Sequence, residues 1–331
     1  MTTKLKLSIA TGNYDRTRPL VDGDVAIDGV DPIFMLLSPE EMFFRSFRDQ
    51  AFDVSELSLS SFAVKTADGN NPYVGVPVFP SRAFRHTAIT IRTDRGINAP
   101  EDLRGRRIGT PEYQLTACVW ARALLQEEYG VAPSDVIWVR GGLEELGRPE
   151  KISIKLPSNI KIEPAPADKT LAQMLKDGDI DAIVAPRAPS CFEQGDPNIG
   201  WLWPNPQDAA SDYFKKTKIF PIMHMIGIRK KLADEHPWLP VAIAKAFSHS
   251  KKRALELLVD TSATKVTLPF VDELLRSARQ LMGDDFWPYG IEPNRYVLDR
   301  FLAYHHEQGL SSRQLTADEL FHPSTLATFK I

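Results

Sequence analysis

The sequence has little cysteine, no long apolar run and no excess of basic residues, and each absence excludes a class of protein. Its two cysteines, Cys118 and Cys191, cannot build a disulfide framework and have no paired metal-ligand spacing. No stretch approaches the roughly 18 apolar residues of a membrane span. Lys and Arg number 40 against 43 Asp and Glu, a net charge of −3. This balance disfavours a general nucleic-acid binder, which needs a basic surface.

Signals for export and for nucleotide binding are also missing. The first apolar run, Leu7–Ala10, is shorter than the roughly 7–15 apolar residues of a secretory signal. If Met1 is the true start, we expect a cytoplasmic protein with no membrane partner. Gly105–Gly109 lacks the G-x-G-x-x-G spacing and no P-loop occurs, so a dinucleotide or phosphate-loop site has no support. We expect no cofactor and no metal, and the sequence leaves a homo-oligomer open.

What the sequence does contain is a repeated order of strand, turn and helix. Its 331 residues give a prior of roughly two domains. Strands that alternate with helices predict an α/β fold with a mainly parallel sheet. The expected strands are Lys4–Ala10, Phe52–Leu57, Thr87–Arg92, Arg106–Gly109, Val136–Val139, Ile180–Ala185 and Ile219–Ile228, and an extended excursion is expected between Leu143 and Pro166.

Several helix boundaries carry local signals. Ser38 begins a capping box with Pro39 at the first helical position, which predicts a helix start. Thr110 is expected to cap a helix that begins at Pro111 and ends near Gly130. Glu112 would then lie in its first turn and complement the helix dipole. Two further helices are expected, one capped by Asp168 and running to about Lys176, and a long one over His236–Leu258.

Three segments together resemble the two-lobed, type 2 periplasmic-binding-protein fold. They are Ala99–Gly109 (APEDLRGRRIG), Leu171–Pro186 (LAQMLKDGDIDAIVAP) and Ile226–Leu239 (IGIRKKLADEHPWL). In that fold the chain leaves the first lobe, builds the second and returns. The resemblance therefore implies a discontinuous first lobe of 1–92 plus 218–331, a second lobe of 93–217, and a ligand cleft between them.

A second set of segments is similar to the 4,5-dihydroxyphthalate decarboxylase family. These segments, spread over nearly the whole chain, are Phe52–Ser61, Pro77–His86, Phe220–His224, Asp285–Arg295 and Glu307–Leu310. The resemblance implies a carboxy-lyase of phthalate catabolism that removes one carboxylate from a catechol dicarboxylate, giving protocatechuate and CO₂. Such a site needs cations that hold a dianion, a proton donor facing the ring carbon and a base for the hydroxyl proton.

Arginines near strand ends are the candidate ligands for the substrate carboxylates. Arg82 and Arg85 lie just before the strand Thr87–Arg92, and a guanidinium binds a carboxylate through a charged, bidentate fork. Arg187 follows the strand Ile180–Ala185 at its carboxyl end, where open α/β sheets place ligands. Thr110 precedes the N-terminus expected of the next helix, which favours anions. Alternatively, the arginines lie in solvent or in a structural ion pair, and Thr110 is only a cap.

His224, Glu56 and His86 are the candidate catalytic residues. His224 lies in the apolar strand Ile219–Ile228, and its near-neutral pKa suits proton transfer, although a histidine there can also be a core or hinge residue. Glu56 is expected at another strand end as its partner acid or base, or else as a buried helix-capping glutamate. Ser55 and Ser58 are candidate hydrogen-bonding groups for the substrate. Trp287 and Tyr289 either form the wall of an aromatic pocket or pack under the C-terminal helices.

Two functions from different classes remain open at this point. One is a cofactor-independent aromatic decarboxylase in the cytoplasm. The other is a solute-binding protein that captures an aromatic or other small carboxylate for uptake or sensing. Both would use the same arginines, so we expect the compartment and a turnover assay to separate them. In either case the expected partner is a small aromatic carboxylate, with no nucleic acid.

Overall fold

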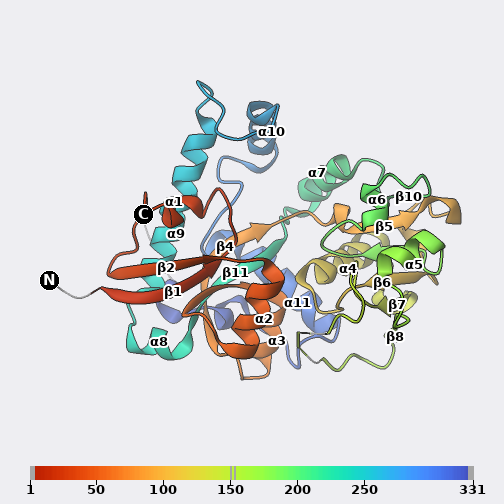
Figure 1. Ribbon diagram of the computed structural model, residues 1–331, viewed down its shortest axis with the longest axis horizontal. Coiled ribbons are helices and arrows are strands. Elements are labelled where there is room, and N and C mark those ends of the chain that lie inside the picture. The colour runs from red at the N-terminus through yellow and green to blue at the C-terminus, as the bar shows by residue number, and fades with distance from the viewer. Residues whose placement is uncertain (1–3, 150, 153, 327–331) are drawn as a thin grey trace. The chain divides into compact units, whose positions relative to one another are not determined.

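Two β-sheets organise the chain, one in each of two structural units (Figure 1). The computed structural model describes residues 4–149, 151–152 and 154–326. The first unit comprises Met1–Arg82, Ile222–Asp299 and Leu315–Ile331, and the second comprises Ala83–Pro221 and Arg300–Gln314. Each unit is therefore assembled from separate stretches of sequence.

The five-stranded sheet of the first unit has the order β2-β1-β3-β11-β4. Its strands are β1 (Leu5–Thr11), β2 (Val30–Leu36), β3 (Val54–Ser58), β4 (Tyr73–Arg82) and β11 (Ile222–Arg229). β1 is parallel to β2 and β3, whereas β11 lies between β3 and β4 and is antiparallel to both. The returning strand thus completes the middle of a sheet that the first 82 residues leave open.

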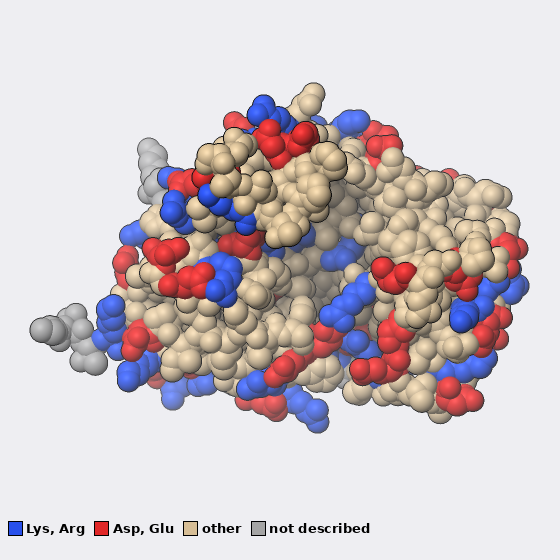
Figure 2. Space-filling view, turned by 45° about the horizontal axis from the view of Figure 1, so that its top comes forward, with Lys and Arg blue, Asp and Glu red and all other residues tan. Residues whose placement is uncertain are grey.

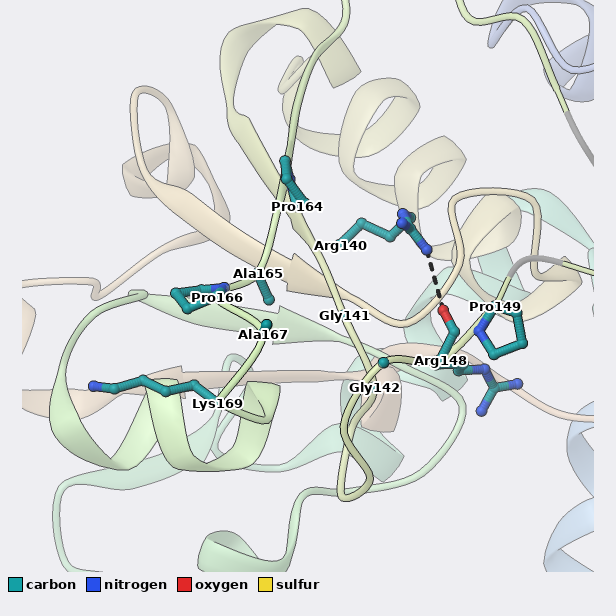
Figure 3. Close-up of a pocket in the computed structure, with 11 residues that line it drawn as sticks. Arg140, Gly141, Gly142, Arg148, Pro149, Pro164, Ala165, Pro166, Ala167 and Lys169 are labelled. Carbon is teal, nitrogen blue, oxygen red and sulfur yellow. Dashed lines mark hydrogen bonds between the residues drawn. The ribbon is translucent and has the colours of Figure 1, made fainter.

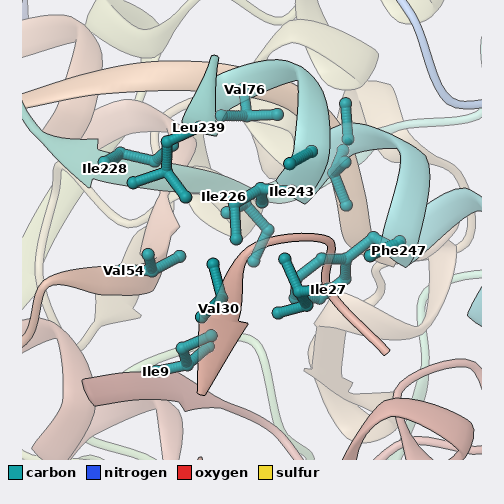
Figure 4. Close-up of a cluster of buried hydrophobic side chains, with 14 of the residues drawn as sticks. Ile9, Ile27, Val30, Val54, Val76, Ile226, Ile228, Leu239, Ile243 and Phe247 are labelled. Carbon is teal, nitrogen blue, oxygen red and sulfur yellow. The ribbon is translucent and has the colours of Figure 1, made fainter. Parts of the chain in front are cut away.

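Helices cover both faces of this sheet. The helices of the first unit are α1 (Arg18–Val21), α2 (Pro39–Asp49), α3 (Leu59–Ala67), α8 (Lys230–Glu235), α9 (Leu239–Val259) and α10 (Val271–Met282). On one face, Val54 and Ile226 from the strands pack with Ile243 of α9 in a buried cluster (Figure 4). A smaller cluster joins Ala10 of β1 to Met42 of α2. Burial of each large apolar side chain contributes roughly 1.5–3 kcal/mol, and these clusters hold the strand ends in place.

The predicted start of α2 is confirmed. Ser38 has extended backbone angles, Pro39 is the first helical residue, and the Ser38 hydroxyl accepts a hydrogen bond from the Glu41 N–H at 3.4 Å. This satisfies one of the N–H groups that the first helical turn leaves without a partner.

The six-stranded sheet of the second unit has the order β10-β5-β9-β6-β7-β8. Its strands are β5 (Ile89–Arg92), β6 (Arg107–Thr110), β7 (Ile137–Arg140), β8 (Lys161–Pro164), β9 (Ala182–Val184) and β10 (Ile199–Trp201). β9, β6, β7 and β8 are parallel neighbours, whereas β5 is antiparallel to both of its neighbours, β9 and β10. The expected α/β class is confirmed, and β8 is the extended excursion expected between Leu143 and Pro166.

The helices of the second unit are α4 (Thr116–Tyr129), α5 (Leu171–Asp177), α6 (Ser190–Glu193) and α7 (Pro206–Thr217). A further helix, α11 (Arg295–Glu307), belongs to both units, which divide at Asp299. Single 3₁₀ turns occur at His86–Ala88, Thr93–Arg95, Pro100–Leu103, Pro133–Asp135, Glu292–Asn294, Ala317–Leu320 and Pro323–Thr325.

Two predicted helix starts are wrong. α4 begins at Thr116, so Thr110 is not its cap and Pro111 is not its first residue. Side chains hold the intervening segment in a turn, since the Tyr113 carbonyl accepts a hydrogen bond from Arg122 at 2.6 Å. In α5 the cap is Thr170 rather than Asp168, and its hydroxyl accepts from the Gln173 N–H. The predicted end of α4 is confirmed, because Gly130 has the left-handed backbone that ends helices.

The units divide the chain elsewhere than the lobes that the resemblance implies. The implied boundary after residue 92 places β5 in the first lobe, but β5 pairs with β9 and β10 of the second unit. The stretch Arg300–Gln314 also belongs to the second unit, since Gln308 accepts a hydrogen bond from Arg122 of α4 at 2.8 Å. Strand pairing and a buried arginine decide these boundaries, and neither is visible in local sequence.

Basic and acidic side chains are interspersed over the face drawn in Figure 2, in keeping with the nearly balanced charge of the sequence. In the part of the chain that the structure describes, no helix is long and apolar enough to cross a membrane.

Candidate active site

The first unit brings two predicted residues, Glu56 and His224, into direct contact. β3 and β11 are antiparallel, with Ser58 opposite His224 and Glu56 opposite Ile226. Glu56 and His224 are therefore diagonal neighbours on one face of the sheet, a position from which long side chains meet. His224 Nδ1 lies 2.6 Å from Glu56 Oε1.

The Glu56 carboxylate accepts hydrogen bonds at both oxygens and is fully buried. Oε1 accepts from the Tyr14 hydroxyl at 2.8 Å as well as from His224. Oε2 accepts from the Gly12 N–H at 2.9 Å and from the Thr11 hydroxyl at 3.2 Å. Burial alone would raise the pKa of Glu56. The hydrogen bond and the charge of His224 lower this pKa, as do the hydrogen bonds from Gly12 and Tyr14, and the net shift is downward. Glu56 is thus a buried anion that orients its neighbours.

This anion settles which nitrogen of His224 is available to a ligand. A carboxylate only accepts, so Nδ1 carries the proton of the shared hydrogen bond and Nε2 is the atom free for proton transfer. The His224 side chain is 16% exposed, and the ring of Phe43 contacts it edge-on, with the ring centroids 4.8 Å apart. The pairing of β11 with β4 shifts register on both sides of His224, and such irregularities re-aim side chains.

Tyr14 is a site residue that the sequence analysis missed. It follows the carboxyl end of β1, which is parallel to β3, so the two strand ends that bear Tyr14 and Glu56 are neighbours. Its hydroxyl is the donor to Glu56 Oε1, and burial together with the Glu56 charge raises its pKa, so that it stays protonated at neutral pH. Its position could have indicated this role, because Tyr14 follows the carboxyl end of the first strand, where open α/β sheets bind their ligands.

Ser55 and Ser58 lie on opposite faces of β3, because successive strand residues alternate. The Ser55 hydroxyl is buried against α2, 2.8 Å from the Ser46 hydroxyl, and donates to the Glu56 carbonyl. The structure thus places Ser55 away from the His224 ring. Ser58 is opposite His224 in the strand register and caps α3, accepting from the Ser61 N–H at 3.4 Å. Only Ser58 is brought to the Glu56–His224 pair.

Arg82 is also in the first unit, but it is engaged with the chain itself. The side chain is buried, and Nη2 donates to the Pro288 carbonyl at 2.8 Å and to the Asn294 side chain. Burial lowers the pKa of Arg82 to about 9, so it remains charged at neutral pH. These contacts tie the irregular segment before α11 to the end of β4. Arg82 therefore has a structural role within the first unit, whereas the sequence predicted a role in substrate binding.

The other predicted residues, Arg85, His86, Thr110 and Arg187, belong to the second unit. Arg187 is exposed just after β9. Thr110 is buried at the end of β6 and its hydroxyl donates to Cys118 Sγ at 3.5 Å. Burial lowers the pKa of Arg85 to about 10. The roles of Arg85, Thr110 and Arg187 as ligands of a substrate stay predictions.

The surroundings of His86 do not suit a proton-transfer residue. Its side chain is buried between Trp203 and Tyr213, with ring centroids 4.8 and 5.6 Å away. Neither ring nitrogen has a hydrogen-bond partner among the residues that the structure describes. Burial lowers the pKa of His86 to about 4, so the ring is neutral in the folded protein. The structure assigns His86 to an aromatic cluster.

We expect His86 to make the protein less stable in mild acid. Unfolded chains protonate this residue near pH 6.5, whereas the folded chain resists protonation down to about pH 4. The free energy of unfolding should therefore fall by about 3 kcal/mol as the pH falls through this window. Urea unfolding from pH 7 to pH 4 should show a shallower decline for His86→Phe than for the parent. An unchanged decline in His86→Phe, or an equal change in the control His236→Phe, would contradict this assignment.

The second unit also contains a cavity of about 490 Å³ beside the carboxyl ends of β7 and β8 (Figure 3). Its basic side chains already have partners. Arg140 donates to the Arg148 carbonyl at 3.2 Å, and Lys169 pairs with two exposed aspartates. Arg148 donates to the buried Glu112 carboxylate at 2.8 and 3.0 Å. Glu112 precedes α4, which begins at Thr116, so it does not lie in the first turn of that helix as expected. Its carboxylate instead forms an ion pair with Arg148.

Comparison with known proteins agrees with this architecture. Residues 83–149 match the family described as NMT1/THI5 like. The crystal structure of the periplasmic aliphatic sulphonate binding protein SsuA from Escherichia coli aligns with a TM-score of 0.54 at 13% identity, covering 100% of this chain and 96% of that one. The protein is therefore built on the fold of the periplasmic binding proteins, as the sequence analysis expected.

Two curated proteins are much more similar in sequence. The 4,5-dihydroxyphthalate decarboxylase of Comamonas testosteroni is 60% identical over 329 residues, covering 99% of this chain and 100% of that protein. The protein of the same name from Pseudomonas putida is 62% identical over 212 residues, covering 64% of this chain and 82% of that protein. This chain belongs to the 4,5-dihydroxyphthalate decarboxylase family.

Proposed function

We propose that this chain decarboxylates an aromatic hydroxy-dicarboxylate without a cofactor, most readily 4,5-dihydroxyphthalate to protocatechuate and CO₂. One observation carries the mechanism: a buried, four-times hydrogen-bonded Glu56 carboxylate holds His224 through Nδ1 and leaves Nε2 for the substrate. The relatives that bear this name supply the substrate class. We place the reaction in the cytoplasm, as expected for an enzyme of aromatic catabolism.

The reaction replaces a carboxylate on the ring by a proton. His224, as imidazolium, transfers the proton on Nε2 to the ring carbon that bears the leaving carboxylate. The hydroxyl para to that carbon gives up its proton to a solvent water, and the ring becomes a cyclohexadienone. The carbon–carbon bond then breaks, its electron pair restores the aromatic ring, and the carbonyl oxygen takes back a proton as CO₂ departs. One proton is consumed and one CO₂ is released, with no change of oxidation state elsewhere.

The residues around His224 support this use of one histidine. The Glu56 carboxylate at Nδ1 fixes the orientation of the imidazole ring and lies beside the positive charge that the ring carries when it donates. Tyr14, Gly12 and Thr11 hold the carboxylate so that it cannot rotate away from Nδ1. Glu56 thus acts through His224 and is a positioning residue. General acid–base catalysis of this kind contributes about 10²–10⁴-fold in rate.

A turnover assay tests the proposal. Purified protein is mixed with 4,5-dihydroxyphthalate, and CO₂ release and protocatechuate absorbance are followed together. We expect the two products in equal amounts, with no added metal or organic cofactor. Binding of the diacid without turnover would instead indicate a solute-binding protein, the alternative that the shared fold leaves open.

A further inference from the structure

Arg16 is a charged side chain beside the Glu56–His224 pair that the mechanism does not use. Its guanidinium carbon lies 4.2 Å from the centroid of the Tyr14 ring and 4.4 Å from that of Trp287. The same Tyr14 donates to Glu56 through its hydroxyl, so one aromatic ring joins Arg16 to the pair. The side chain of Arg16 is 18% exposed.

The position of this guanidinium is fixed from several directions. Nε donates to the Pro80 carbonyl at 2.5 Å. The ring of Trp287 is itself held, because its Nε1 donates to the Phe79 carbonyl at 2.9 Å. A planar cation packed against two anchored rings loses little conformational freedom when it binds a ligand.

The charge of Arg16 is only weakly compensated. Among the residues that the structure describes, its carboxylate partner is Asp15, 3.1 Å from Nη1, and the Asp15 side chain is 55% exposed, so solvent screens the pair. Nη2 donates to none of the residues that the structure describes. A guanidinium with its Nη2 group available, packed against two aromatic rings, is suited to bind a carboxylate that is attached to an aromatic ring.

A buried hydroxyl near Arg16 has no hydrogen-bond partner among the described residues. The Tyr289 hydroxyl is buried, with no hydrogen bond to any residue in the described part of the chain. The charges of Arg16, Arg82 and Glu56 all act on this hydroxyl, so it lies among the same groups. A buried hydroxyl without a partner costs free energy unless a ligand or water pairs with it.

We propose that Arg16 binds the carboxylate that the aromatic substrate keeps, while its guanidinium packs against the rings of Tyr14 and Trp287. This inference rests on the proposed function and names the residue that selects the substrate class. The leaving carboxylate loses its charge in the reaction, so a cation on it would stabilise the ground state more than the transition state. The retained carboxylate keeps its charge throughout, and Arg16 can hold it without opposing the departure of CO₂.

The experiment compares two ligands that differ only in that carboxylate. Protocatechuate has it, and catechol does not. Calorimetric titration of each into the parent protein and into Arg16→Gln measures binding without turnover. We expect protocatechuate to bind about 10- to 100-fold more weakly to Arg16→Gln, as for loss of a charge-assisted hydrogen bond, while catechol binding changes less than about threefold. Arg18→Gln is the control, because Arg18 lies two residues away in an exposed pair with Asp22.

Several outcomes would overturn the assignment. If protocatechuate and catechol weaken together, or if neither weakens, Arg16 only supports the fold. A thermal melt of each variant identifies loss of folding. If Arg16→Gln does not fold, Arg16→Lys keeps the charge but not the planar fork, and it should still lower the preference for protocatechuate over catechol. An unchanged preference in a folded Arg16→Lys would count against the proposal. Because these titrations need no turnover, a negative result in the decarboxylation assay leaves them interpretable.

Discussion

Replacing His224 with glutamine should lower kcat for 4,5-dihydroxyphthalate by about 10²–10⁴-fold. Glutamine can still hydrogen bond to Glu56, but it has no titratable nitrogen and cannot deliver a proton to the ring carbon. Binding should change little, because the proposed role of His224 is at the reacting carbon rather than at the charged groups of the substrate. The variant therefore separates proton transfer from recognition.

Steady-state kinetics and calorimetric binding of protocatechuate measure the two effects. His249→Gln is the matched control, since His249 lies on α9 of the same unit and has no part in the proposed site. A fall in kcat no larger than that of His249→Gln would show that another group protonates the ring. Equal losses in binding and in kcat would indicate that His224 shapes the pocket instead.

Replacing Glu56 with glutamine should lower kcat by about 10²–10³-fold, and it should do so through His224. The amide keeps the size of the carboxylate but removes the negative charge that lies beside His224 Nδ1. Combining Glu56→Gln with His224→Gln should cost little more than His224→Gln alone, since residues that act as a unit are not additive. Additive losses in the double variant would mean that Glu56 is only structural.

The same substitution should change the response of the protein to acid. The pKa of Glu56 is lowered below its usual value of 4.5 in the folded chain, so its contribution to stability is present above that value. The contribution is lost as the pH falls through the lower folded value. Urea unfolding below pH 4.5 should show a shallower loss of stability in Glu56→Gln than in the parent. Glu41→Gln, at an exposed pair with Arg45, should leave the parent's acid response unchanged.

Much of the fold could be predicted because its signals are local. The Ser38 cap, the glycine that ends α4 and the alternation in β1 each depend on a few adjacent residues. The family could be predicted from segments spread over the chain. Within the site, His224 was expected because it lies in an apolar strand, and Glu56 because it lies at a predicted strand end.

The rest of the site depends on distant contacts. Ser55 and Glu56 are adjacent in sequence, and only the pairing of β3 decides which one faces His224. Arg82 meets Asn294, 212 residues away, which no pattern near Arg82 indicates. Tyr14 reaches Glu56 across 42 residues, and Arg16 is flanked by Trp287 from a segment without regular structure. Register and long-range packing are properties of the whole sheet, so local motifs could not reveal them.

The place of β11 in the first sheet also bears on biosynthesis. β3 and β4 emerge from the ribosome well before residues 222–229, and until then each lacks its central neighbour. Unpaired strand edges are prone to wrong associations, so the nascent chain passes through a vulnerable interval while the intervening unit is translated. Glu56 and His224 lie 168 residues apart, and the enzyme can become competent only when translation has passed the later one.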